Sequence, residues 1–160
     1  MYSTGHTLNA FLRRGHGHGQ NRDADPYYRH VTQCGIHGIL TNLTLGNIRH
    51  DDVADHGTDA QGLFYSARLY SGGMTYSYVS SAWIEPVANF GNPDYVSPVG
   101  PDGVFGRTIR EVAQDLADAL VHCQGGDGWW HYNCQQSSTD CSTNGWAPEA
   151  LRLLERKVGV

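Results

Sequence analysis

The feature that most constrains the fold is an amphipathic segment over residues 108–122. Thr108 and Glu111 have the spacing of a capping box, in which each side chain accepts a backbone amide at the start of a helix. The apolar residues that follow fall on one helical face, and they are Ile109, Val112, Ala113, Leu116 and Leu120. Because such a face must be covered by another element, the segment predicts packed helical layers.

Four other segments favour helices, and they cover residues 4–14, 26–43, 72–88 and 145–156. In the second, Asp25 is placed to cap a helix that has Pro26 at its first position. Gly35 and Gly38 inside it indicate the close approach of a neighbouring helix. The residues expected to be buried on this helix include Val31, Cys34, Ile39 and Leu43.

The connections between these helices are long and irregular. Residues 15–25, 47–61 and 92–106 are polar or rich in Gly and Pro, whereas residues 63–70 favour a short strand or an extended segment. The chain of 160 residues is long enough for one domain, so we predict an all-α fold of helical hairpins over residues 1–160. Because the first short helix cannot bury its apolar stripe alone, we also expect the chain to be a segment of a longer repeat protein.

Charge and hydropathy exclude two classes of partner. The net charge is −5, and the 11 basic residues form no run along a helix, so no nucleic-acid partner is expected. No apolar run reaches the ~20 residues that cross a bilayer, so we expect no membrane span.

The carboxyl-terminal part carries a recognisable motif. Residues 128–132 read Gly-Trp-Trp-His-Tyr, and residues 137–140 read Ser-Ser-Thr-Asp. Trp146 lies at the start of an Ala- and Leu-rich helix that contains Glu155. This pattern resembles the prenyltransferase and squalene-oxidase repeat, as found in large bacterial repeat proteins. Two positions depart from the repeat, because Gly145 replaces a frequent glutamine and Cys141 follows the aspartate.

The resemblance implies an α/α toroid, or an arc of one, in which such loops fasten consecutive helices together. The structural motif would comprise Trp129, Trp130, Tyr132, Asp140 and Trp146. The residues themselves fit this role, since Gly126 and Gly128 permit a tight turn. Asp140 is placed to accept amides at the start of the last helix.

Residues 139–143 are also similar to the catalytic stretch of oxidosqualene cyclases. That resemblance implies Asp140 as a general acid in a terpenoid-cyclase-like enzyme. A cyclase needs a large cavity inside a full double barrel of helices, which five helices cannot enclose. We therefore expect Asp140 to act as a helix cap and the chain to be non-catalytic.

The acidic loop is the candidate metal site. Asp51, Asp52, Asp55 and Asp59 are dense enough to hold Ca²⁺, and His50 and His56 would allow Zn²⁺ instead. The spacing matches no EF-hand, zinc finger or zinc-binding helix, and such composition is typical of solvated loops. We therefore expect no bound cofactor.

The cysteines and a sequon point to the compartment. Cys134 and Cys141 flank a short loop, and Cys34 and Cys123 lie on helices that can pack together, so these are two plausible disulfides. Four cysteines allow three pairings, and buried free thiols remain an alternative. With the glycosylation sequon at Asn42, the cysteines favour an extracellular or cell-surface location.

Three functions are consistent with these features. An arc of hairpins exposes apolar edges at both ends, which predicts a structural module that associates head to tail with copies of itself or with neighbouring repeats. Its aromatic residues allow a glycan- or lipid-binding module as the first alternative. The terpenoid-cyclase-like enzyme is the second alternative.

Overall fold

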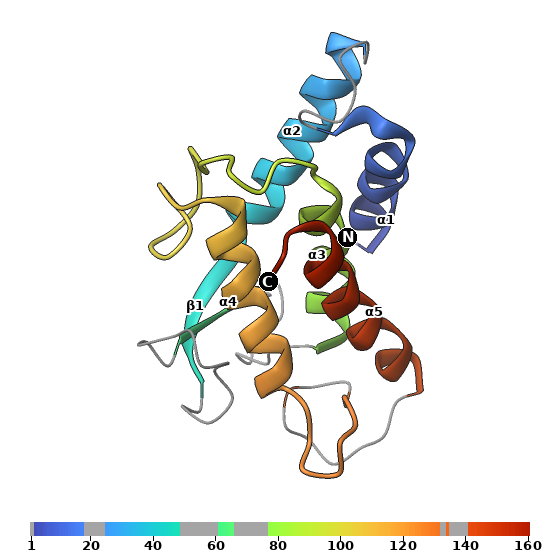
Figure 1. Cartoon of the computed structure of the whole chain (residues 1–160), viewed down its shortest axis with the longest axis vertical. Coiled ribbons are helices and arrows are strands. Elements are labelled where there is room, and N and C mark those ends of the chain that lie inside the picture. Colours follow the sequence, from blue (N-terminus) through green and yellow to red (C-terminus); the bar gives the residue numbers. More distant parts are fainter. Residues whose placement is uncertain (1, 18–24, 49–60, 66–76, 132–133, 135–140) are drawn as a thin grey trace.

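The computed structural model describes residues 2–17, 25–48, 61–65, 77–131, 134 and 141–160 (Figure 1). The elements in chain order are α1 (Tyr2–Phe11), a π-helical turn η1 (Leu12–His16), α2 (Pro26–Leu40), β1 (Leu43–Asn47), β2 (Gln61–Tyr65), α3 (Ser77–Asn89), α4 (Ile109–His122) and α5 (Cys141–Lys157). The described part is mostly helical with one small sheet, which agrees with the predicted class in outline. The toroidal arrangement stays a prediction.

Helix α4 forms as its sequence predicts. The Thr108 hydroxyl accepts the Glu111 amide at 3.2 Å, and the Glu111 carboxylate accepts the Thr108 amide at 2.7 Å. This reciprocal pair satisfies two amides that the first turn of a helix otherwise leaves without partners. All five residues of the apolar stripe are buried, so the predicted core face is confirmed.

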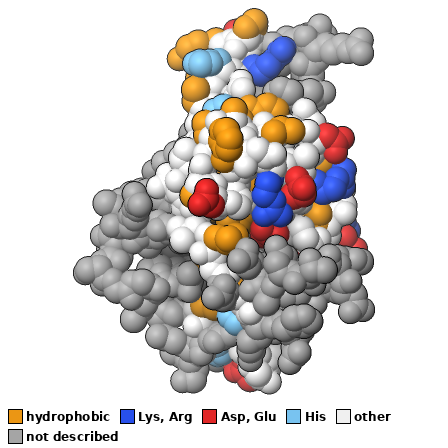
Figure 2. Space-filling model, turned by 90° about the vertical axis from the view of Figure 1, so that its left-hand side faces the viewer, with side chains coloured by type: hydrophobic (Ala, Val, Ile, Leu, Met, Phe, Trp, Pro, Cys, Tyr) orange, Lys and Arg blue, Asp and Glu red, His pale blue; other side chains and the backbone are white. Residues whose placement is uncertain are grey.

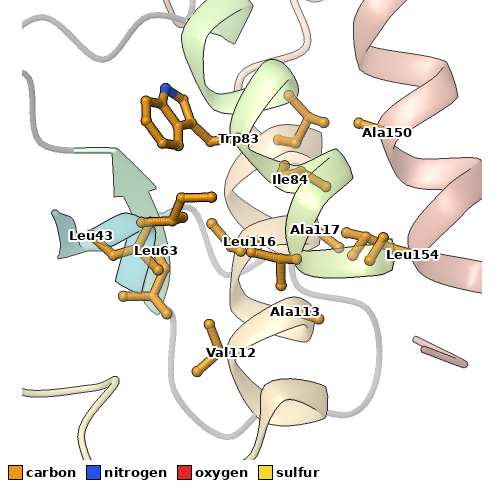
Figure 3. Close-up of a cluster of buried hydrophobic side chains, with 14 of the residues drawn as sticks. Leu43, Leu63, Trp83, Ile84, Val112, Ala113, Leu116, Ala117, Ala150 and Leu154 are labelled. Carbon is orange, nitrogen blue, oxygen red and sulfur yellow. The ribbon is translucent and has the colours of Figure 1, made fainter. Parts of the chain in front are cut away.

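Helix α3 lies at the centre of the helical packing and contacts α1, α4 and α5. Ile84 is fully buried on α3, and in Figure 3 its side chain lies close to Ala117 of α4 and Leu154 of α5. At the α1 side, Asn9 and Arg13 both donate to the Glu85 carboxylate. Apolar and polar contacts together therefore join the amino-terminal helix to the carboxyl-terminal half.

The two-stranded antiparallel sheet is a departure from the predicted all-α fold, although β2 overlaps residues 63–70, where a short strand was one of two predicted alternatives. Strand β1 begins at Leu43, because α2 ends at Leu40 rather than at the predicted residue 43. Leu45 pairs with Leu63 across the sheet, and β2 packs against α4. A Cβ atom on Gly62 would lie 2.9 Å from the Ala119 Cβ, so only glycine permits this close approach.

The predicted buried residues of α2 are confirmed in part, because Ile39 and Leu43 are buried, although Leu43 belongs to β1. Ile36, Ile39 and Leu40 are buried, whereas Val31 and Cys34 are exposed. The first half of α2 projects beyond the rest of the molecule, which leaves Val31 and Cys34 without a covering layer among the described residues (Figure 1).

The two glycines of α2 have different surroundings. A Cβ atom on Gly35 would lie 2.8 Å from the Leu8 Cδ1 atom of α1, so the predicted close helix approach is confirmed there. A Cβ atom on Gly38 would meet nothing within 4 Å, so the same prediction is wrong for Gly38.

Other boundaries shift by a few residues. Helix α5 already includes Cys141, four positions before the predicted residue 145. Helix α3 is described from Ser77, and residues 72–76 of its predicted range lie outside the described residues. Gly15, with φ = 86°, ends the first helical segment where the break was predicted. The connector over residues 92–106 is irregular, as predicted. No helix among the described residues is long and apolar enough to cross a bilayer.

Candidate functional site: a tryptophan loop and an aromatic groove

The connection from α4 to α5 starts with a loop of residues 124–131, here called the tryptophan loop. Cys123 at the end of α4 and Cys134 form a disulfide with a sulfur–sulfur distance of 2.11 Å. This pairing corrects both predicted disulfides, Cys134 with Cys141 and Cys34 with Cys123. Cys34 and Cys141 are exposed free thiols, and sequence spacing alone had no means of selecting the observed pair.

Backbone hydrogen bonds fix the shape of the tryptophan loop. The Gly125 amide donates to the Trp129 carbonyl at 2.8 Å, and the Gly128 amide donates to the Gly125 carbonyl at 2.9 Å. Gly128 has φ = 83°, in the left-handed region that favours glycine. The Gln124 side chain donates to the Gly128 carbonyl at 2.8 Å. The loop is thus held at several points, and its tip has a defined conformation.

Trp130 fastens this loop to both flanking helices. Its indole Nε1–H donates to the Leu120 carbonyl of α4 at 2.7 Å, and its side chain is buried. The Asn144 side chain of α5 accepts the Trp130 amide at 2.8 Å and donates to the Trp130 carbonyl at 3.0 Å. Because α4, the loop and α5 all meet at this residue, the contacts suit the fastening role that the resemblance implies.

Trp129, in contrast, presents its side chain outward. It is 53% exposed, and the neighbouring Asp127 side chain is 50% exposed. The Trp129 amide donates to Asp127 Oδ1 at 3.1 Å, and His131 lies 3.3 Å from the same oxygen. These contacts hold the pKa of the Asp127 carboxyl below its usual range, with the Trp129 amide as the largest cause. The loop therefore displays an aromatic ring beside a carboxylate.

A groove lies where α1, η1 and the start of α2 meet. Its volume is about 670 Å³, and it is lined by Thr7, Ala10, Phe11, Arg14, His16 and Tyr28. The Phe11 and Tyr28 rings stack with centroids 5.7 Å apart, and the His16 ring lies 4.8 Å from that of Tyr28. We call this feature the aromatic groove.

The aromatic groove was not predicted from the sequence. Phe11 and Tyr28 are 17 positions apart in the sequence, on either side of a glycine-rich stretch. Only the packing of α1 and η1 against the start of α2 brings their rings together. A local pattern search therefore has no signal for it.

The tryptophan loop and the aromatic groove lie at opposite ends of the molecule. In Figure 1, with the longest axis vertical, η1 and the start of α2 are at the top, and the segment that follows α4 is at the bottom. Figure 2 shows hydrophobic side chains over the projecting upper part and mixed acidic and basic side chains below them. Both ends thus carry exposed aromatic side chains.

Of the other predicted site residues outside the acidic loop, two lie in the described part of the chain and two do not. Trp146 is half-buried on α5, and Asn42 is exposed after α2, with its side-chain amide donating to the Gly38 carbonyl at 2.7 Å. Tyr132 and Asp140 lie outside the described residues, so the capping and general-acid roles of Asp140 stay predictions.

The acidic loop that was predicted as a candidate metal site lies outside the part of the chain that the structure describes. Asp51, Asp52, Asp55 and Asp59 all lie outside the described residues. Within the described part, no group of three or more His, Cys, Asp or Glu side chains is arranged to hold a metal ion. The calcium hypothesis for the acidic loop stays open.

Neither a scan against protein-family models nor searches of curated proteins and of solved structures found a match to this chain. The resemblance to the prenyltransferase and squalene-oxidase repeat therefore depends on the motif residues alone.

Proposed function

We propose that this chain is a non-catalytic building block that associates head to tail with copies of itself, in a filament or repeat array. One observation carries the proposal, namely the apolar surface on the projecting half of α2. Tyr27 is 68% exposed, Tyr28 38% and Val31 36%. Tyr27, Val31 and Cys34 are spaced at i, i+4 and i+7, so they share one helical face, here called the α2 stripe.

An apolar helical face of this kind ordinarily packs against a neighbouring helix. Single exposed apolar residues are common, but a row of them on a projecting helix marks an interaction surface. The second exposed aromatic residue, Trp129, belongs to the tryptophan loop, and the segment that follows α4 lies at the opposite end of the molecule. Two different surfaces at opposite ends favour a heterologous contact, which gives an open chain of subunits when the rotation does not close.

The disulfide supports an extracellular or cell-surface setting for this assembly. Disulfides persist in oxidising compartments and are rare in the cytosol. The Cys123–Cys134 bond closes the tryptophan loop, so an oxidising setting also preserves the conformation of that loop.

The test is the assembly state of the chain as its concentration is raised. We expect reversible association at micromolar concentration, weakened in the variant Tyr27→Glu/Val31→Glu because it places charge on the α2 stripe. Phe105→Glu is the matched control, since Phe105 is 66% exposed on the connector between α3 and α4. An unmodified chain that remains monomeric would contradict the proposal.

A second candidate function is glycan binding through Trp129. An exposed indole on a loop held by a disulfide is a suitable platform for the apolar face of a sugar ring. Here, the monomer would bind glycans, and Trp129→Ala would abolish binding while leaving Trp130 and the fold intact. A glycan-array screen of the monomer distinguishes this candidate from self-association.

A further inference from the structure

We infer that Trp129 of one copy docks into the aromatic groove of the next copy, where Asp127 approaches Arg14. The inference rests on the proposed function and names the centre of its contact. The α2 stripe borders this contact, because the Tyr27 ring packs edge-on against Tyr28 of the groove with centroids 5.8 Å apart. Each copy offers one tryptophan loop and one aromatic groove, so each copy has a site for a neighbour at both ends.

The shape of the molecule excludes docking of the tryptophan loop within its own chain, so the loop that enters the groove belongs to a second copy. The tryptophan loop and the groove lie at opposite ends of the longest axis, so Trp129 does not reach the groove of its own chain (Figure 1). A contact between two different surfaces is heterologous, and its repetition adds copies in one direction.

The chemistry of the two surfaces is complementary. The rings of Phe11 and Tyr28 line the groove, and aromatic pairs favour offset-stacked or edge-to-face contact with an indole. Arg14 is the charged residue among the six that line the groove, and Asp127 supplies an exposed carboxylate two positions from Trp129. A guanidinium–carboxylate pair at the rim would fix the orientation of the docked loop.

The tryptophan loop is already ordered for docking. Its backbone is held by the Cys123–Cys134 disulfide and by the hydrogen bonds of Gly125 and Gly128. A surface that is ordered before binding loses less conformational entropy on association. Tryptophan is also among the residues that most often dominate the free energy of binding.

The experiment uses two variants of the full chain that each lack one half of the contact. Trp129→Ala removes the docking side chain and keeps the groove, whereas Arg14→Glu puts a carboxylate in the groove opposite Asp127 and keeps the loop. Both positions are exposed, so both variants should fold, and thermal melting followed by circular dichroism is the check of their folding. Phe105→Ala serves as the control because it truncates an aromatic residue that is somewhat more exposed than Trp129 and lies elsewhere.

Sedimentation velocity is measured on each variant alone and on an equimolar mixture. We expect each single variant to weaken association at least about 30-fold, which corresponds to the loss of about 2 kcal/mol of binding free energy that is typical of a central interface residue. The mixture should form a one-to-one heterodimer and stop there, because only one intact loop and one intact groove remain. Phe105→Ala should assemble like the unmodified chain.

The possible failures are distinguishable. If the unmodified chain associates but both variants associate equally well, the docking inference is wrong and the proposed function stands. A mixture that stays monomeric, or an equal loss in Phe105→Ala, also overturns the inference. If the unmodified chain itself is monomeric, the proposed function fails and the inference fails with it.

Discussion

Replacing Cys123 and Cys134 together by alanine is expected to destabilise the chain, and the structure sets the size of the effect. The bond spans 11 positions along the sequence, and closing a loop of that length lowers the entropy of the unfolded chain. The loop-entropy relation gives about 3 kcal/mol at 25 °C. For a chain of this size, that loss corresponds to a fall in Tm of about 6–12 °C.

The assay is urea unfolding, followed by circular dichroism and by tryptophan fluorescence. The matched control replaces Cys34 and Cys141 by serine, because both are exposed free thiols. We expect that control to change the free energy of unfolding by less than about 0.5 kcal/mol. We also expect the Cys123→Ala/Cys134→Ala variant to have a larger m-value, since its unfolded chain is more expanded.

Two results would refute this reasoning. One is a Cys123→Ala/Cys134→Ala variant as stable as the unmodified chain. The other is an equal loss in the Cys34→Ser/Cys141→Ser variant, which would instead indicate that those cysteines are bonded. Peptide mapping without reductant identifies the bonded pair independently.

Three further perturbations test the packing and the caps. Ile84→Ala should cost about 2–5 kcal/mol in chemical unfolding, because the side chain is fully buried between helices. Asn144→Ala should cost about 1–3 kcal/mol, since it leaves the Trp130 amide and carbonyl without this partner, and a loss near zero would contradict the fastening role. Thr108→Ala should cost about 1 kcal/mol by removing the cap of α4. The hydrogen bond from the Thr108 side chain lowers the pKa of Glu111 in the folded state. The ionised Glu111 carboxylate therefore stabilises the fold at a pH above its pKa in the unfolded chain, and this stabilisation is lost as the pH falls through its pKa in the folded chain. Between pH 7 and pH 3, the free energy of unfolding should therefore fall less in Thr108→Ala than in the unmodified chain.

Local signals were sufficient for some elements. The capping box and continuous apolar stripe predicted α4 almost to the residue, because both signals lie within the helix itself. The turn at Gly15 and the irregular connector over residues 92–106 were predicted for the same reason.

Non-local contacts decided the elements that the sequence analysis missed. Leu43 and Leu45 were not recognised as strand residues, because their partners on β2 lie about twenty positions further along the chain. Val31 and Cys34 were placed in the core because the periodicity of a helix shows which residues share a face and not which face is covered.

The candidate site divides in the same way. The motif residues identified the tryptophan loop, but only the structure distinguishes Trp130, which is buried, from Trp129, which is exposed. The disulfide partner of Cys123 and the aromatic groove both depend on how the chain folds back on itself. Neither was accessible from spacing alone.

The most direct test of self-association is sedimentation velocity on the unmodified, oxidised chain, from micromolar to millimolar concentration. The account predicts a weight-average sedimentation coefficient that rises continuously with concentration, as in an open head-to-tail series. A single species with the sedimentation coefficient of the monomer across the whole range would contradict it.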